Sequence, residues 1–269
     1  MKKLIIITGI TGAVGNALLA RYAQDDDTVI YGISRKAHPM ADFINPETGK
    51  IYTQTLIGSI EGLSDESIGK FIHTIDTKAF ASITYFHCLG LYPFEVKTNG
   101  DYIVENDLDN DGINDTTYHL SYTVYRSFVD QLIQHTKNSI KFRSMIFGSL
   151  SDKHEPKAHQ SWWKTMKITK DYMKTLAAEN VGMHVMNISS ITCSHEIITR
   201  PFVFIKTNAD LRYWLTPCDL ANQVHNILTD TESYNGFQEH ESYRKFPNFD
   251  MATYYQNKYF TPRKVSELY

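Results

Sequence analysis

Three glycines near the amino terminus have the spacing of a turn that binds phosphate. Gly9, Gly12 and Gly15 follow the apolar run 4–7, which is typical of a buried parallel strand, and they open a helical pattern. The first glycine permits a tight bend, the second lets backbone N–H groups approach a pyrophosphate, and the third lets the helix pack closely on the strand. The spacing therefore predicts a dinucleotide site. The other residues of this turn that we expect to bind the cofactor are Thr11, Ala13 and Val14.

A second predicted strand, residues 28–34, ends in Ser34-Arg35-Lys36. A site that prefers NAD usually has an acidic residue here, which hydrogen-bonds the ribose 2′-hydroxyl. The basic side chains of Arg35 and Lys36 suit the additional phosphate of NADP instead. We therefore expect NADP(H) as the cofactor, with Ser34, Arg35 and Lys36 at its 2′-phosphate. The alternative interpretation is a chance glycine-rich turn with basic residues on the surface.

Ser149 follows the predicted strand 144–148, at the edge where ligands bind in open α/β sheets. Its hydroxyl is placed to hydrogen-bond a substrate oxygen, and the alternative is a polar strand end. Trp162 and Trp163 follow on a predicted helix. An indole N–H donates a hydrogen bond but does not titrate usefully, so we expect these rings to shape a pocket or stack on substrate, with packing as the alternative. Candidate proton donors, each with a structural role as its alternative, are His87, Tyr92, Tyr118, His119 and Tyr122.

The segment 107–115 has carboxylates at alternate positions and a glycine at residue 112, which is similar to a calcium-binding loop. The bidentate glutamate expected at the twelfth loop position is replaced by Tyr118, and no paired second loop exists. We therefore expect a solvated acidic loop and no metal. A loop of this length is also long for its position and could cover substrate.

The composition excludes several classes of partner. The chain has 269 residues and a net charge of −3, so it favours neither nucleic acid nor an anionic membrane. Cys88, Cys193 and Cys218 lack metal-ligand spacing, and their apolar neighbours predict buried thiols in a reducing compartment. The apolar run after Met-Lys-Lys is too short for a signal peptide, and no stretch approaches a membrane span. We therefore expect a cytoplasmic protein.

Strand-like and helix-like segments alternate along the chain, which predicts an α/β fold. We expect a single doubly wound, Rossmann-type parallel sheet with helices on both faces. The expected later strands are 51–57, 82–88, 144–148 and 183–188. The expected helices are 13–23, 64–75, 116–134, 161–179 and 217–228. Residues 233–269 are rich in aromatics without a clear period, so we expect a domain over 1–232 and a tail over 233–269 that packs on it or on a neighbouring subunit.

Residues 1–230 resemble the short-chain dehydrogenase/reductase family. The motifs that carry the resemblance are Thr8-Gly9-x-x-Gly12-x-x-Gly15, Phe86-His87-Cys88-Leu89-Gly90, Ile146-Phe147-Gly148-Ser149, Leu176-Ala177-Ala178-Glu179, 182–188 and 215–221. The resemblance implies that Leu89 and Gly90 contact the cofactor and that Ser149 is the active-site serine. It also implies assembly through 116–134 and 161–179, as a homodimer or a homotetramer.

The resemblance fails at the family's catalytic tyrosine and lysine, which stand four residues apart on one helix. Counting from Ser149 gives Trp162 and Met166, and a shift of one residue gives Trp163 and Lys167. Lys167 is then a candidate ribose-binding lysine, with a solvated lysine as the alternative. We expect an atypical NADPH-dependent reductase of a small carbonyl, imine or activated alkene. The alternatives are a non-redox catalyst, such as a cyclase or isomerase, and a non-catalytic NADP(H)-binding scaffold or sensor.

Overall fold

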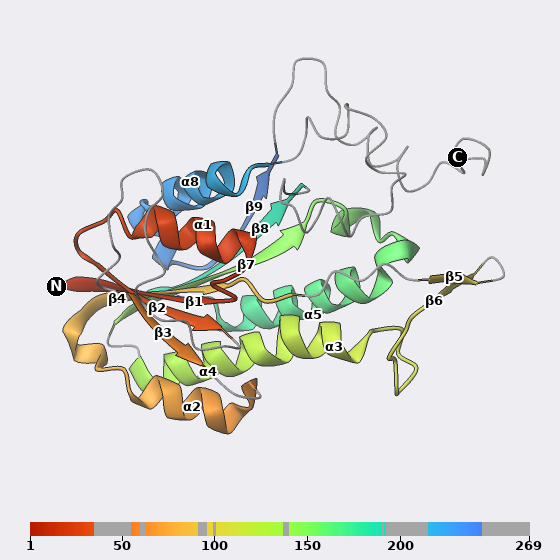
Figure 1. Ribbon diagram of the computed structural model, residues 1–269, viewed down its shortest axis with the longest axis horizontal. Helices are drawn as coiled ribbons and strands as arrows, with labels where there is room; N and C mark the ends of the chain where they lie inside the picture. Colours follow the sequence, from red (N-terminus) through yellow and green to blue (C-terminus); the bar gives the residue numbers. More distant parts are fainter. Residues whose placement is uncertain are drawn as a thin grey trace, which may run out of the picture.

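The computed structural model describes residues 1–34, 55–59, 63–90, 96–98, 101–136, 140–189, 191 and 215–243. Its centre is one sheet of seven strands in the order β3-β2-β1-β4-β7-β8-β9 (Figure 1), and every neighbouring pair is parallel. The strands are β1 (Lys2–Thr8), β2 (Thr28–Ser34), β3 (Thr55–Ser59), β4 (Phe80–His87), β7 (Lys141–Ser149), β8 (Val181–Ile188) and β9 (Phe237–Ser242). A short antiparallel hairpin, β5 (Val96–Thr98) and β6 (Asp101–Ile103), stands apart from this sheet.

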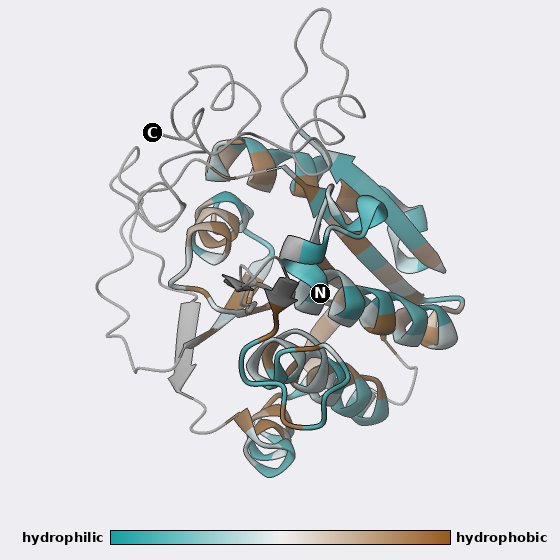
Figure 2. Ribbon diagram, turned by 90° about the vertical axis from the view of Figure 1, so that its right-hand side faces the viewer, coloured by the Kyte–Doolittle hydropathy of each residue, from teal (hydrophilic) through white to brown (hydrophobic). Residues whose placement is uncertain are grey.

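Helices cover both faces of the sheet, as Figure 1 shows. On one face lie α1 (Ala13–Tyr22) and α8 (Pro217–Leu228), and on the other lie α2 (Asp65–His73), α4 (Val124–Thr136) and α5 (Gln160–Leu176). Because both faces are covered, the central strands are apolar on both sides. Leu4 and Ile6 of β1 belong to the core on the α2–α4–α5 side, whereas Ile5 and Ile7 belong to the core on the α1–α8 side. In Figure 2 the helices alternate between brown and teal residues, because one side of each helix faces the sheet and the other faces solvent.

The helix before β7 is not regular. It begins as α3 (Asp115–Tyr118), continues as a five-residue π-helix (His119–Thr123) and becomes α4. Asn114 caps its first turn, because its side-chain oxygen accepts a hydrogen bond from the Thr117 N–H at 3.0 Å. The sequence predicted one uninterrupted helix over 116–134. A π-turn widens the helix and frees backbone carbonyls for other partners, and such turns are frequent at functional sites.

The expected fold class is confirmed: this is a doubly wound, Rossmann-like parallel sheet with helices on both faces. Residues 237–242 differ from the expectation for the tail, because they form β9, the last strand of the sheet. The strand was missed because it lies at the edge and is mostly polar, so it shows no buried apolar run. Residues 244–269, the rest of the expected tail, lie outside the described residues.

Two smaller findings concern composition. None of the helices in the described part of the chain has the length and apolar character that crossing a membrane requires. Cys218 is exposed on the first turn of α8 and Cys88 is only partly buried, so the prediction of buried thiols was wrong for Cys218. The first turn of α8 is amphipathic, and Cys218 lies on its outer side. Cys193 lies outside the described residues.

Candidate functional site

The glycine turn connects β1 to α1 at the carboxyl edge of the sheet. Gly9 has a φ of +70°, and a Cβ atom there would lie 2.6 Å from the Cys88 carbonyl oxygen, so only glycine fits without strain. Its N–H donates to the Ile33 carbonyl at 3.0 Å, which joins the turn to β2. A Cβ on Gly15 would collide with the Gly9 carbonyl oxygen, so this glycine allows the helix to lie tightly against the turn. The roles expected for these two glycines are therefore visible in the backbone.

The first turn of α1 has the features of an anion site. Gly12 is its N-cap, no side chain caps the helix, and no acidic residue stands in the first turn. The leading N–H groups of a helix have no partner within it, and they lie at the positive end of the helix dipole. The chain at Thr11, Ala13 and Val14 therefore fits the pyrophosphate of a dinucleotide. Ser34 ends β2 beside this turn, whereas Arg35 and Lys36, expected at the 2′-phosphate, lie outside the described residues.

The segment after β4 runs next to the glycine turn. The Cys88 N–H donates to the Thr8 carbonyl at 3.1 Å, and a Cβ on Gly9 would lie 3.3 Å from Cδ2 of Leu89. Gly90 faces α5, because a Cβ there would lie 3.2 Å from Cζ3 of Trp162. Leu89 and Gly90 are therefore near the turn as the resemblance implied. Trp162 is 7% exposed and packs against this segment.

His87, one of the candidate proton donors, is fully occupied by structural contacts. Its Nε2 lies 2.8 Å from the Leu120 carbonyl in the π-turn, and a carbonyl only accepts, so Nε2 bears the hydrogen. Its Nδ1 therefore accepts from the Tyr85 hydroxyl at 2.8 Å. Burial lowers the pKa of His87 to about 4, so the ring is neutral at physiological pH. His87 connects β4 to the π-turn, and its one ring proton is engaged by the Leu120 carbonyl.

The other candidate donors on this helix lie away from Ser149. The Tyr118 and Tyr122 rings are 5.0 Å apart, and the Tyr122 ring meets that of Tyr172 at 5.9 Å, so these rings form a cluster between α3 and α5. Burial raises the pKa of Tyr118, which disfavours its ionised form. His119 is exposed. The structure brings neither Tyr118 nor His119 into the cavity beside Ser149, and Tyr92 lies outside the described residues.

Ser149 is the last residue of β7 and begins a tight turn in which Ser151 and Asp152 contact it. Its hydroxyl lies 2.8 Å from the Ser151 hydroxyl, and its N–H donates to Oδ2 of Asp152 at 3.0 Å. Burial raises the pKa of Asp152 to about 7. The Ser149 N–H, the charge of Lys170 and the indole of Trp162 oppose this rise, and the charge of Glu239 adds to it. Sequence reasoning missed Asp152, because a lone aspartate in a loop has no spacing that predicts its burial.

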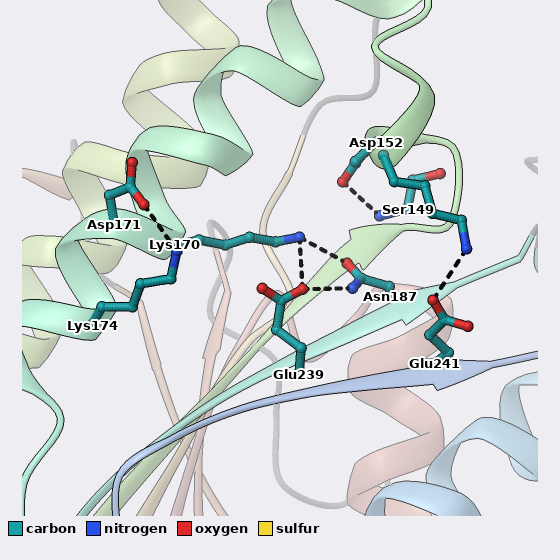
Figure 3. A network of polar contacts seen from close by, with 9 residues as sticks. Ser149, Asp152, Lys170, Asp171, Lys174, Asn187, Glu239 and Glu241 are labelled. Atoms are coloured by element: carbon teal, nitrogen blue, oxygen red, sulfur yellow. Dashed lines mark hydrogen bonds and ion pairs between the residues drawn. The ribbon is translucent and has the colours of Figure 1, made fainter.

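A cavity of about 290 Å³ opens beside Ser149, between α5 and the last strands of the sheet. Lys170 of α5 reaches across it to Oε2 of Glu239 at 3.1 Å and to Oδ1 of Asn187 at 3.3 Å (Figure 3). The Asn187 amide also donates to Glu239, at 3.1 Å. Among the sequence-predicted residues, Ser149, Trp163 and Lys167 line this cavity. Its described lining does not include the glycine turn, so these two parts of the predicted site remain separate in the described structure.

Helix α5 carries the residues that counting from Ser149 predicted as replacements for a catalytic tyrosine and lysine. Trp162 and Met166 are both buried in the core on this side of the sheet. Lys167 is exposed at the rim of the cavity, and Lys170, one turn further on, is the lysine that enters it. The Lys170 side chain is 16% exposed. Lys170, three residues beyond the predicted lysine, hydrogen-bonds side chains of β8 and β9. Lys174, one turn further along α5, lies 5.5 Å from the centre of the Phe237 ring of β9.

The acidic loop is organised by its own backbone. The N–H groups of Asp111 and Gly112 donate to the two carboxylate oxygens of Asp107 at 3.1 and 2.9 Å. Carboxylate oxygens of Asp107, Asp109 and Asp111 lie within 4.8 Å of one another. The loop is attached to α5, because the Lys164 ammonium donates to the Asp111 carbonyl at 2.7 Å. The expectation of a loop without metal stays a prediction.

Comparisons with known proteins place the fold. No family model and no curated protein matches the sequence. A solved structure of L-sorbose reductase from Gluconobacter frateurii, complexed with NADPH and L-sorbose, superposes with a TM-score of 0.70 at 14% identity, over 90% of this chain and 95% of that one. An alcohol dehydrogenase from the archaeon Thermococcus sibiricus, complexed with 5-hydroxy-NADP, gives 0.70 at 12% identity, over 93% and 100%. A 3-ketoacyl-(acyl-carrier-protein) reductase from Brucella melitensis, complexed with NADH, gives 0.65 at 14%, over 90% and 96%. The chain shares the fold of these enzymes.

Proposed function

We propose that this chain is an atypical short-chain dehydrogenase/reductase that uses NADPH to reduce a small organic molecule. The observation that carries the proposal is the uncapped amino terminus of α1 behind a glycine at φ +70°, which fits a pyrophosphate. The solved structures with the same fold include complexes with NADPH and with an NADP analogue, which supports the same cofactor class here. Basic residues at positions 35 and 36 favour NADPH over NADH.

The chain's own residues would divide the work as follows. The N–H groups of the α1 turn would hold the pyrophosphate, Arg35 and Lys36 would hold the 2′-phosphate, and Leu89 and Gly90 would contact the cofactor. The bound nicotinamide supplies a hydride, which is the chemistry of the cofactor itself. The Ser149 hydroxyl, at the carboxyl end of β7, orients the acceptor atom by a hydrogen bond. Trp163, which lines the cavity, would narrow it and exclude water, whereas Trp162 packs against Gly90 in the core.

The substrate class follows from the missing tyrosine. Imines and conjugated alkenes depend less on a strong acid next to an alkoxide than carbonyls do, so we place them beside carbonyls as substrates. The cavity of about 290 Å³ fits a small molecule. The second candidate is a non-redox catalyst, a cyclase or isomerase, and one observation favours it. Counting from Ser149 puts Trp162 and Met166 at the positions that the resemblance gives to the proton donor and the lysine, and both residues are buried.

Titration of the purified chain with NADPH and NADH, followed by fluorescence, tests the proposal. We expect micromolar binding of NADPH and binding of NADH that is about tenfold weaker or more. Replacing Arg35 by alanine removes the preference but leaves NADH binding unchanged, because NADH has no 2′-phosphate. Oxidation of NADPH with a panel of imines, enones and ketones then separates a reductase from a non-redox catalyst. If neither nucleotide binds, the proposal is wrong.

A further inference from the structure

Reduction of a carbonyl or imine requires a proton as well as a hydride, and the residues described so far do not supply one. A serine hydroxyl orients but is a weak acid, and the Trp162 indole does not titrate usefully. His87 has both ring nitrogens engaged and is neutral. The donor must therefore be a different titratable group that meets Ser149.

Asp152 is the carboxyl group that the chain folds back onto Ser149. It follows β7 by three residues, and its Oδ2 accepts the hydrogen bond from the Ser149 N–H at 3.0 Å (Figure 3). A Cβ on Gly148 would lie 2.5 Å from Oδ1 of Asn187 and 3.3 Å from Oδ2 of Asp152, so a glycine at this position makes room chiefly for Asn187 and lets the carboxyl group lie close to the end of β7. The other oxygen of Asp152, Oδ1, is buried and accepts no hydrogen bond of ordinary geometry from the described residues. Asp152 also lines the cavity that Ser149 opens into.

The groups that face Asp152 come from four elements, and their effects on the charge of its carboxyl group oppose one another. Lys170 of α5 brings a positive charge and Glu239 of β9 a negative one, and they bind each other at 3.1 Å. Asn187 of β8 bridges this pair, while the Ser149 N–H of β7 and the Trp162 indole of α5 favour the ionised carboxylate. Because these contributions oppose one another and burial disfavours charge, the carboxyl group can hold or release a proton near neutral pH.

We propose that Asp152 is the proton donor of this reductase, in the place of the family's missing tyrosine, an inference that rests on the proposed function. In the reduction step the acceptor carbon gains a hydride from the reduced nicotinamide, which is oxidised. The carbon–oxygen or carbon–nitrogen π bond breaks, and its electron pair takes the proton from the carboxyl group of Asp152. Asp152 is left as a carboxylate beside Lys170, and it regains a proton from water at the mouth of the cavity.

Replacing Asp152 by asparagine tests the proposal, because the amide keeps the shape and still accepts from the Ser149 N–H but has no acidic proton. We expect kcat to fall by about 100-fold or more, with NADPH affinity within about twofold of the wild type. The matched control is Asp27→Asn, at the opposite edge of the sheet, where Asp27 forms an exposed ion pair with Lys3 at 2.9 Å. That variant keeps the wild-type kcat. A rate for Asp152→Asn within a few-fold of the wild type overturns the proposal.

The pH profile provides a second test that does not require the variant to fold. The donor must be protonated for reduction, so kcat/KM of the wild type, which reports groups of the protein before substrate binds, is constant in acid and falls tenfold per pH unit above the pKa of Asp152. Carbon-13 NMR of the aspartate carboxyl groups, in the protein without nucleotide, locates that pKa independently of activity. We expect the resonance that titrates near neutral pH to coincide with the kinetic profile and to be absent from Asp152→Asn. If no aspartate titrates there, Asp152 is not the donor.

The two hypotheses fail in different ways. If the wild type binds NADPH but oxidises it with no member of the panel, the proposal of a reductase is wrong. The proposed role of Asp152 as its proton donor is then wrong as well. A wild type that reduces substrate while Asp152→Asn does so equally well contradicts only the donor. If Ser149→Ala loses activity and Asp152→Asn does not, the proton comes from solvent.

Discussion

The buried carboxyl group of Asp152 also makes the stability of the folded protein depend on pH. Its pKa, about 7 in the folded state, lies above the ordinary value of 3.8, so the folded protein binds an additional proton between these values. This contribution to stability is complete in acid and is lost as the pH rises towards 7, by at most about 1.4 kcal/mol per pH unit. We expect Asp152→Asn to gain stability relative to the wild type between pH 5 and pH 8. Urea unfolding at both pH values measures this difference in the free energy of unfolding, with Asp27→Asn as the control. If the variant and the wild type change equally between the two pH values, the prediction is wrong.

Two glycines with the same backbone angle separate strain from steric collision. Gly9 and Gly236 both have a φ of +70°, but a Cβ on Gly9 would lie 2.6 Å from the Cys88 carbonyl oxygen, whereas a Cβ on Gly236 would meet nothing within 4 Å. Gly236→Ala should therefore cost only the backbone term, about 1 kcal/mol. Gly9→Ala should cost clearly more and abolish nucleotide binding, because the turn must shift. Thermal unfolding and NADPH titration of both variants provide the comparison, and equal losses would argue against the collision.

At the scale of elements, a pair of histidines joins β8 to β9. His184 Nε2 donates to the Ser233 carbonyl at 2.6 Å, so its Nδ1 accepts from Nε2 of His240 at 3.1 Å. Burial lowers the pKa of His184 to about 4 and also lowers that of His240. A depressed pKa adds stability above the ordinary value of 6.5, and that stability is lost as the pH falls towards 4. The free energy of unfolding therefore changes with pH in the opposite direction to the contribution of Asp152. Each contribution is measured by comparing the variant of that residue with the wild type.

We expect His184→Gln to lose less stability than the wild type when the pH falls from 7 to 5, because glutamine keeps both hydrogen bonds without titrating. The difference is at most about 1.4 kcal/mol per pH unit below 6.5. His73→Gln, on the exposed side of α2, is the control. Urea unfolding at the two pH values measures the difference, and a His184→Gln curve that follows the wild type would show that this pair does not sense acid.

The elements differ in how well local sequence predicts them, and the reasons are physical. The strand 28–34 and the helix 217–228 were predicted with their observed bounds, because local signals mark both ends. In α8, the Thr216 side chain accepts from the Asp219 N–H at 3.0 Å and Pro217 occupies the first turn. The Leu120 carbonyl of the π-turn accepts from His87 of β4, which is 33 residues away in the sequence, so no local pattern encodes this contact. The glycine turn could likewise be predicted from the local spacing of its glycines, whereas Asp152 became a candidate only through its burial against α5 and β9.

At the scale of the whole molecule, β9 decides where the folded unit ends. The sequence predicted a boundary at residue 232, and that division stays a prediction. Beyond this boundary lie Ser233, whose hydroxyl accepts from the buried Arg143, and all six residues that pair with β8. We expect a chain cut after residue 232 to lose cooperative unfolding, because it loses both, and a chain cut after residue 243 to keep it. Circular dichroism of the two truncated chains checks this, and a cooperative 1–232 chain would support the predicted boundary.

The position of β9 has a consequence for how the protein is made. A chain still being synthesised can form the glycine turn as soon as β1, β2 and β4 are present, but Glu239 is added only with β9, which follows β8 by about fifty residues. Until then β8 is an open edge, with unpaired N–H and C=O groups that can join a strand of another chain. During this interval Lys170 and Asn187 also lack Glu239, which both of them contact in the folded protein. Translation speed over the codons between β8 and β9 therefore sets how long each newly made molecule is exposed to aggregation.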